Sequence, residues 1–199
     1  LTLPPSCRWS GDHLELLDQR QLPGAVVFMQ LHRWQEVAEA ISSMAVRGAP
    51  AIGIAAAWGV VLAARSGDDL PTAIRGLRAS RPTAVNLGWA LNRMQAAMGA
   101  AAPVDVEALA GVAAALQQED RLLTQRLVDH GVSLLAQGCR VLHHCHTGAI
   151  ATGGVGTALG VIAAAHARGL LRHAWLDETR PRLQGAALSA WELGCLGVP

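Results

Sequence analysis

The stretch CRVLHHCHTGAIATGGVGTALGVIAAAHARGLLRHAWLDE, residues 139–178, decides the fold, because the pattern of the chain changes where it begins. CRVLHHC (139–145) is typical of a short strand, GVGTALGVIAAAHARG (154–169) of a helix rich in small residues, and HAWLDE (173–178) of a second strand. LQGAALSAWELGCLG (183–197) then predicts a second helix. A strand–helix–strand–helix order with connections of this length favours a parallel sheet.

The residues before this stretch are mainly of helical type. Helices are expected at residues 33–46, 51–64, 70–79, 84–98 and, as one or two segments, 106–137. The first of them would place Val37, Ile41 and Met44 on one face. Pro50 suits the first turn of the second helix, which is apolar nearly all round, and Asp105 suits the N-cap of the last.

We therefore expect an α/β protein with two domains. Residues 1–137 form a mainly helical N-terminal domain with a small antiparallel sheet, where the turn Leu22-Pro23-Gly24 separates LELLDQ from AVVFMQL. Residues 138–199 form the first part of a Rossmann-like parallel C-terminal domain. Because two strands leave the edges and faces of such a sheet uncovered, we expect a truncated domain whose remainder follows Pro199 or lies on another chain.

Composition excludes several classes of protein. The chain has 199 residues, 51% of them hydrophobic, and a net charge of +1. Its sixteen basic residues are all arginine and are dispersed along the chain, which argues against a nucleic-acid partner. The longest apolar stretch, residues 49–64, is shorter than the roughly 20 residues that a bilayer crossing needs. Residues 1–12 lack the apolar block of a secretory signal, so a cytoplasmic protein with four reduced cysteines is expected.

The dense group His143, His144, Cys145 and His146 raises the question of a metal site. These are good ligand types, but neighbouring strand residues point to opposite faces of a sheet. Zinc sites seldom use consecutive residues. Metal binding is therefore disfavoured, and His143 and His144 can equally be polar residues at the end of a strand.

The glycines that follow raise the question of a dinucleotide loop. TGGVGTALG supplies Gly154 and Gly156, but Leu159 stands where the third glycine of that motif belongs. Asp177 follows at a suitable distance, yet eight residues separate Cys145 from the first of these glycines. Dinucleotide binding is therefore disfavoured, although a glycine-rich turn before a helix can still offer N–H groups to a phosphate.

Cys145 can also be a reactive thiol. It is expected at the carboxyl end of a strand in a parallel sheet, where ligands bind, with histidines beside it and a helix start ahead. A cysteine in this position can act as an acid, a base or a nucleophile, and a buried structural cysteine is the alternative.

Two arginines precede prolines in loops that lead into helices. VRGAPAIG places Arg47 and backbone amides before the apolar helix, and SRPTAVNL repeats the arrangement with Arg81 before Pro82. Such a loop can hold a phosphate, whereas a single arginine is more often a surface salt-bridge partner. Two of them in a region with few charges favour an anion site.

Four motifs carry a resemblance to a known family: SMAVRGAPAIGIAAAWG, RPTAVNLGWAL, HCHTGAIATGGVGTALGVI and DETRPRLQGAALSAWEL. In this order they resemble the methylthioribose-1-phosphate isomerases, the aldose–ketose isomerases of methionine salvage. The similarity begins at RWSGDHLELLDQRQLP and covers nearly the whole chain. Ribose-1,5-bisphosphate isomerase and the regulatory subunits of translation initiation factor two-B, which are binding proteins, share the same fold.

The resemblance implies site residues. Cys145 matches the active-site cysteine, which assists the transition state. The implied substrate-binding residues are Arg47, Gly48, Ala49, Arg81 and Gln184. The proton-donor aspartate of the family and an asparagine–lysine pair belong to a later segment, so no aspartate of this chain receives that role. Two positions depart from the pattern: His146, where many relatives have asparagine, and Ala187, where arginine is common.

The resemblance also implies the reaction. We expect a homodimer that isomerises 5-methylthioribose 1-phosphate to 5-methylthioribulose 1-phosphate, with no metal or organic cofactor. An isomerase of the ribose-1,5-bisphosphate type and a non-catalytic binding subunit are the alternatives. The joint presence of Cys145, Arg47, Arg81 and Gln184 argues against a binding subunit. Without the aspartate, the 199-residue piece alone is expected to be inactive.

Overall fold

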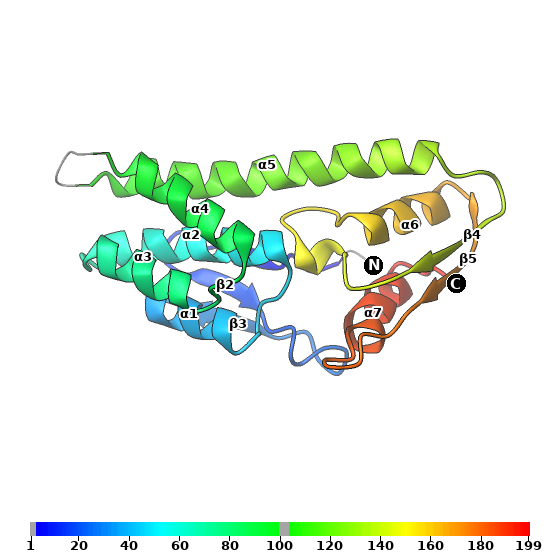
Figure 1. Ribbon diagram of the computed structural model, residues 1–199, viewed down its shortest axis with the longest axis horizontal. Coiled ribbons are helices and arrows are strands. Elements are labelled where there is room, and N and C mark those ends of the chain that lie inside the picture. The colour runs from blue at the N-terminus through cyan, green and yellow to red at the C-terminus, as the bar shows by residue number, and fades with distance from the viewer. Residues whose placement is uncertain (1–2, 100–103) are drawn as a thin grey trace.

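The computed structural model describes residues 3–99 and 104–199, and Figure 1 shows the arrangement of its helices and strands. In chain order the elements are β1 (Cys7–Trp9), β2 (Leu14–Leu17), β3 (Phe28–Leu31), α1 (Trp34–Ser42), α2 (Ala49–Arg65), α3 (Leu70–Ala79), α4 (Val85–Ala97), α5 (Val106–Ser133), β4 (Cys139–His143), α6 (Ala158–Ala167), β5 (Leu171–Leu176) and α7 (Ala190–Cys195). A 3₁₀ turn (Ala149–Ala151) precedes α6, and a π-helical turn (Gly185–Ser189) leads into α7.

The expected antiparallel sheet is present, with β2 between β1 and β3. Leu14 is paired with Leu31, and Leu17 with Phe28, across the connection that contains the predicted turn. Leu14 and Leu16 are buried while Glu15 between them is partly exposed, because successive strand side chains point to opposite faces. The third strand, β1, was not expected from the sequence.

Helix α2 forms the centre of the N-terminal core. Its residues from Ala51 to Ala63 are all buried, as expected for a helix that is apolar on every side. Helices α1, α3, α4 and α5 pack against it, and Trp58 stacks on Trp9 with 4.7 Å between ring centroids. Pro50 occupies the first turn, where a missing N–H breaks no hydrogen bond of the helix.

Helix α1 is shorter than expected. It ends at Ser42, and Met44 beyond it has a left-handed φ of 63°. The prediction that Met44 shares a helical face with Val37 and Ile41 is therefore wrong, although those two residues are buried. The physical reason is a turn in which the Val46 N–H donates to the carbonyl of Ala40 (3.2 Å), so the chain leaves the helix axis.

Helix α5 is continuous over 28 residues and runs along the length of the molecule in Figure 1. Asp105 caps it as predicted, since its carboxylate accepts hydrogen bonds from the N–H groups of Glu107 and Ala108. The helix packs against α2 and α4 and also against α6. Across residues 3–99 and 104–199, no helix combines the length and the apolar character needed to span a membrane.

The second sheet is parallel, with β4 paired to β5 from Cys139–Leu171 to His143–Leu176 and an irregularity after the first pair. Figure 1 shows α6 and α7 near these strands, and residues of both helices share one apolar cluster. The predicted strand–helix–strand–helix order and the α/β class are thus confirmed. The proposed domain boundary at residue 137 lies between α5 and β4 and stays a prediction.

Several boundaries in this region differ from those expected. Strand β4 ends at His143 instead of residue 145, and β5 covers Leu171–Leu176 instead of residues 173–178. Helix α6 begins at Ala158 instead of residue 154, and a π-helical turn precedes α7. Between residues 148 and 157 several backbone N–H groups bond to side chains from other elements instead of to helical carbonyls. Residues 154–157 belong to this irregular segment, although the sequence pattern assigned them to helix.

Candidate active site

Cys145 lies two residues after β4, at the carboxyl edge of the parallel sheet. Its side chain is exposed, and its backbone φ is 69°. The N–H of Asp177 donates to the carbonyl of His143 (2.8 Å), so the segment that follows β5 reaches the same edge. Parallel sheets bind their ligands at this edge, so the exposed Cys145 is in a position to contact a bound ligand.

The histidines near Cys145 have separate surroundings. His143 is buried with Nε2 2.8 Å from Oγ1 of Thr147, and burial lowers its pKa. His144 is exposed, and His146 is buried against α7. Over the part of the chain that the structure describes, no three His, Cys, Asp or Glu side chains are grouped so that they could hold a metal ion.

Arg47 is the buried cation of the site. It is 8% exposed, and its Nε has no hydrogen-bond partner among the described residues. Burial lowers its pKa, and the positive charges of Arg182 and Arg81 lower it further. A buried guanidinium within electrostatic reach of two others marks a site where an anion would offset the repulsion on Arg47.

The loop that carries Arg47 contacts the loop that follows β4. Gly48 has a φ of 101°, and a Cβ at this position would lie 2.3 Å from the carbonyl oxygen of Ala151. The Nε2 of Gln19 donates to the carbonyls of Arg47 (3.2 Å) and Ile150 (2.9 Å). One buried amide side chain therefore joins the two loops.

Two helix N-termini add backbone donors near these arginines. Helix α2 begins at Ala49 after Gly48, and α4 begins at Val85 after Ala84; neither N-cap residue makes a side-chain hydrogen bond. Arg81 is half-buried in the turn that precedes α4. Uncapped N–H groups at the positive end of a helix dipole favour an anion, as the arginines do.

Gln184 is held in a compact turn after β5. The hydroxyl of Thr179 donates to Oε1 of Gln184 (2.8 Å) and accepts from its backbone N–H (3.2 Å). Glu178 accepts hydrogen bonds from backbone N–H groups of the following turn, and these bonds lower its pKa. Arg182 belongs to the same turn. Because its positive charge lowers the pKa of Arg47, this turn lies within electrostatic reach of the loop that carries Arg47.

The glycines after Cys145 do not form an open phosphate loop. The N–H of Gly153 donates to Asp120 of α5 (2.6 Å), and those of Gly154 and Gly156 donate to the hydroxyl of Thr152. A dinucleotide loop needs such amides free for the pyrophosphate. Here they hold the chain in place beside α5.

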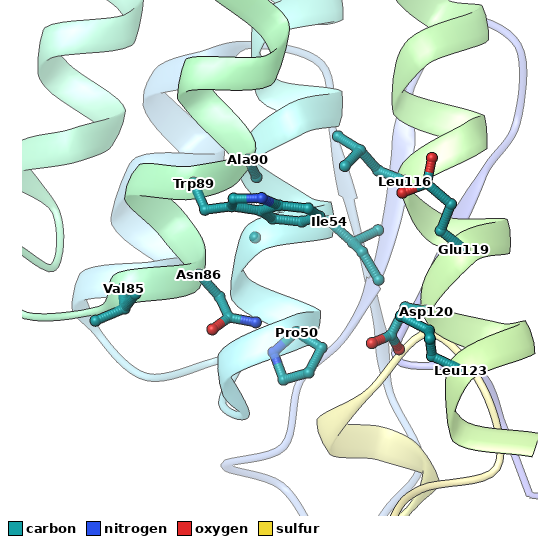
Figure 2. A pocket seen from close by; sticks show the side chains of 11 residues that line it. Pro50, Ile54, Val85, Asn86, Trp89, Ala90, Leu116, Glu119, Asp120 and Leu123 are labelled. Atoms are coloured by element: carbon teal, nitrogen blue, oxygen red, sulfur yellow. The ribbon is translucent and has the colours of Figure 1, made fainter. Parts of the chain in front are cut away.

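A cavity of about 400 Å³ opens between α2, α4 and α5 (Figure 2). Its walls are mostly apolar and include the ring of Trp89; Asn86 and Asp120 lie on either side of Pro50 in Figure 2. Burial raises the pKa of Asp120. The lining residues are Pro50, Gly53, Ile54, Val85, Asn86, Trp89, Ala90, Leu116, Glu119, Asp120 and Leu123. The cavity begins at the first turn of α2, three residues after Arg47.

The structure relates predicted residues from three segments. Arg47 lies within electrostatic reach of Arg81 and of Arg182, which is in the same turn as Gln184, and Gln19 joins the Arg47 loop to the loop after Cys145. Sequence reasoning missed Arg182 and Gln19. Arg182 stands inside the quoted motif DETRPRLQGAALSAWEL, where a second arginine in a short loop was the available signal. Nothing in the sequence around Gln19 indicates that it bridges two distant loops.

This fold and site define the class of protein. The chain belongs to the initiation factor 2 subunit family, whose model matches residues 45–199. The matched range includes Arg47, Arg81, Cys145 and Gln184.

Within that family the chain is similar to particular isomerases. It is 92% identical over all 199 residues to the methylthioribose-1-phosphate isomerase of Synechococcus sp. (strain CC9605). It is 50% identical, over 96% of its length, to the methylthioribose-1-phosphate isomerase of Alkalilimnicola ehrlichii. The chain spans 59% and 58% of the lengths of these two relatives.

Solved structures of two kinds share the fold. The 5-methylthioribose 1-phosphate isomerase from Pyrococcus horikoshii OT3 superimposes with a TM-score of 0.91 at 36% identity, over 99% of this chain and 59% of that one. Translation initiation factor eIF-2B, subunit delta, from A. fulgidus gives a TM-score of 0.82 at 35% identity, over 98% and 61%. Because an isomerase and a translation factor share the fold, function has to be argued from the site.

Proposed function

We propose that the protein to which this chain belongs isomerises 5-methylthioribose 1-phosphate to 5-methylthioribulose 1-phosphate in methionine salvage. The observation that carries the proposal is the buried Arg47 side chain, within electrostatic reach of Arg81 and Arg182, in a loop that Gln19 joins to the loop after Cys145. A phosphate site and an accessible acid–base group in one place suit a phosphorylated sugar. The names of the isomerases to which the chain is similar support the same substrate.

Each site residue receives a role in this proposal. Arg47 and Arg81 bind the phosphate, together with the backbone of Gly48 and Ala49 at the start of α2. The Gln184 amide, fixed by its hydrogen bonds to Thr179, contacts a sugar hydroxyl. No organic cofactor or metal takes part in these contacts.

The chemistry follows from the position of the phosphate on C1. The ester prevents the ring from opening as a free hemiacetal does, so the enzyme has to assist ring opening before hydrogen moves between C2 and C1. Acid–base groups are needed on both sides of this carbon pair. Cys145 stands on one side, and the aspartate expected in a longer form of the protein stands on the other. Excluding water from the site limits loss of phosphate from the reactive intermediate.

The test is an assay of ketose formation by the full-length protein with methylthioribose 1-phosphate. Cys145→Ala is expected to lower kcat by about 100-fold or more, the usual contribution of a positioned acid–base group. Cys195→Ala, at the end of α7, is the matched control and should keep wild-type kcat. An inactive wild-type protein would refute the assignment, and full activity in Cys145→Ala would refute the role of the cysteine.

A binding subunit is the second candidate, because the fold match to eIF-2B, subunit delta, is also extensive. A subunit that only binds a partner has no need for a buried arginine beside an exposed thiol. The same assay separates the two candidates, since a binding subunit shows no turnover.

We also propose that the full-length protein is a cytoplasmic homodimer. Leu134 and Leu142 are large apolar side chains that are 85% and 71% exposed, which supports a further covering surface. Light scattering of the full-length protein measures the mass of the assembly, and a monomer would contradict this part of the proposal.

A further inference from the structure

A network of buried polar side chains contacts the backbone of the Cys145 segment, and the proposed chemistry gives this network no role. Its centre is the pair formed by His146, in the loop after β4, and Glu192 of α7. The Nε2 of His146 is 3.2 Å from Oε1 of Glu192, and both side chains are only 2% exposed. Buried ionisable groups are retained only where they have partners, so the contacts of this pair indicate its role.

Glu192 binds the backbone of the loop as well as the histidine. Its carboxylate accepts hydrogen bonds from the N–H groups of Ala149 (2.8 Å) and Ile150 (3.2 Å). The approach is close, because a Cβ at Gly148 would lie 2.3 Å from Oε2 of Glu192. One carboxylate therefore fixes the 3₁₀ turn that begins four residues after Cys145.

His146 holds the other end of the same segment. The hydroxyl of Ser189 donates to the carbonyl of Cys145 (3.4 Å), and its oxygen can then accept from Nδ1 of His146 at 3.1 Å. Ser189 is fully buried at the junction between the π-helical turn and α7. The imidazole thus ties the segment of Cys145 to α7 through the hydrogen bond of Nδ1, while Nε2 lies close to the Glu192 carboxylate without a hydrogen bond among the described residues.

The backbone of Cys145 needs such support. Its φ of 69° lies in the left-handed region, which non-glycine residues seldom adopt without fixed surroundings. This conformation leaves the Cys145 side chain exposed while the next residue, His146, is buried. A segment free to relax would lose this arrangement.

We propose that His146 and Glu192 are positioning residues that hold Cys145 at the edge of the sheet facing the arginine cluster. The proposal rests on the proposed function, since Cys145 is the group that is positioned. The network also reaches the phosphate side of the site, because Ile150, bound by Glu192, accepts from the same Gln19 amide that donates to Arg47. One buried network therefore sets both halves of the site relative to each other.

The experiment compares variants of the full-length protein. His146→Leu removes both ring nitrogens at similar volume, whereas His146→Asn keeps one donor and one acceptor. Glu192→Gln replaces one acceptor oxygen by a donor that faces another donor. His166→Leu, near the end of α6, makes the same chemical change away from the network and serves as the control. A cooperative thermal unfolding transition, measured for each variant, is the check that the variant is folded.

Two readouts are measured for each variant. The first is the split between kcat and KM: His146→Leu is expected to lower kcat at least tenfold and to change KM less than threefold, and His146→Asn to restore kcat to within threefold of wild type. The second is the rate at which iodoacetamide alkylates Cys145, followed by peptide mass. We expect at least a threefold rise in His146→Leu and Glu192→Gln, because the released segment exposes Sγ in more conformations. Rates within twofold of wild type are expected for His146→Asn and His166→Leu.

The two readouts separate this inference from the proposed function. A wild-type protein without turnover, together with the expected alkylation rates, contradicts the proposed reaction and supports the positioning role. Wild-type alkylation rates in both His146→Leu and Glu192→Gln overturn the positioning role, whatever the activity. The positioning role is also overturned if His146→Asn restores neither kcat nor the alkylation rate of Cys145, because the hydrogen-bonding atoms of residue 146 would then not matter.

Discussion

At the scale of single residues, unusual backbone conformations gather at the site. Within the described ranges, the non-glycine residues with a left-handed φ are Met44, Cys145 and Leu183. Met44 stands three residues before Arg47, and Leu183 directly precedes Gln184. Strained conformations of this kind persist where the surrounding structure holds them, and they are common at functional sites. Nothing in the side chains of Met, Cys or Leu favours this conformation, so sequence reasoning had no means of finding it.

Gly48 offers a direct test of the contact between the two loops. Gly48→Ala is expected to lower the free energy of unfolding by about 2 kcal/mol or more, because its Cβ meets the backbone of Ala151 in a conformation that is already strained. Gly11→Ala is the control, since Gly11 has a similar φ of 93° but nothing within 4 Å of a Cβ. That variant should lose about 1 kcal/mol. Equal losses in urea unfolding would show that the close approach at Gly48 is unimportant.

At the scale of elements, α5 supports the whole site. It packs against α2 and α4, which begin shortly after Arg47 and Arg81 in the chain, and against α6, which follows the loop of Cys145. Asp120 on the same helix holds the turn at Gly153. The Asp105 cap of this helix was predicted from the sequence, which left open whether residues 106–137 form one helix or two; its role as a common support follows only from packing.

Two glycines on α5 separate helix propensity from packing. Gly131→Ala is expected to lower the free energy of unfolding by about 1–3 kcal/mol, because the new Cβ would lie 2.6 Å from Cγ2 of Val161 on α6. Gly111→Ala, on an exposed face with nothing within 4 Å, should raise it by up to about 1 kcal/mol. Urea unfolding of both variants measures the difference, and changes of the same sign would contradict the predicted contact with α6.

Asp120 leads to a prediction about pH. Burial raises the pKa of this carboxyl above its value in the unfolded chain, so folding favours the protonated form. The wild type should therefore gain stability from this group as the pH falls through the raised pKa. Asp120→Asn, whose amide oxygen can still accept from Gly153, should be more stable than wild type at pH 7 and should lose that advantage near pH 4.

The measurement is the free energy of unfolding of both proteins at several pH values between 7 and 4. Asp129→Asn is the control, because Asp129 is an exposed carboxylate on the same helix. An Asp120→Asn protein whose advantage grew as the pH fell would have the wrong sign and would contradict the burial of the charge.

At the scale of the whole molecule, the second sheet has apolar residues without cover in the described structure. Leu142 and Trp175 are register partners on β4 and β5, and they are 71% and 48% exposed. A parallel sheet usually has both faces covered. This agrees with a chain that spans 59% of the length of its curated relatives.

A piece limited to residues 1–199 should therefore lack isomerase activity even if the full-length protein has it. The resemblance places the proton-donor aspartate in a later segment, so acid–base chemistry on one side of the substrate would be missing. The check is ketose formation by equal amounts of the two purified proteins. Measurable turnover by the piece would show that the chemistry lies within these residues and that the role of the aspartate is misplaced.

The sequence by itself determined the order of helices and strands apart from β1, the parallel pairing of β4 with β5 and the position of Cys145 at the carboxyl edge of a strand. These features follow from local periodicity and turn residues, which depend on neighbours along the chain. Only the tertiary structure decided that Arg182 approaches Arg47, that Gln19 joins two loops and that Glu192 lies against the loop of Cys145. These contacts link residues 28 or more positions apart, so they depend on how whole elements pack, and a local pattern carries no information about them.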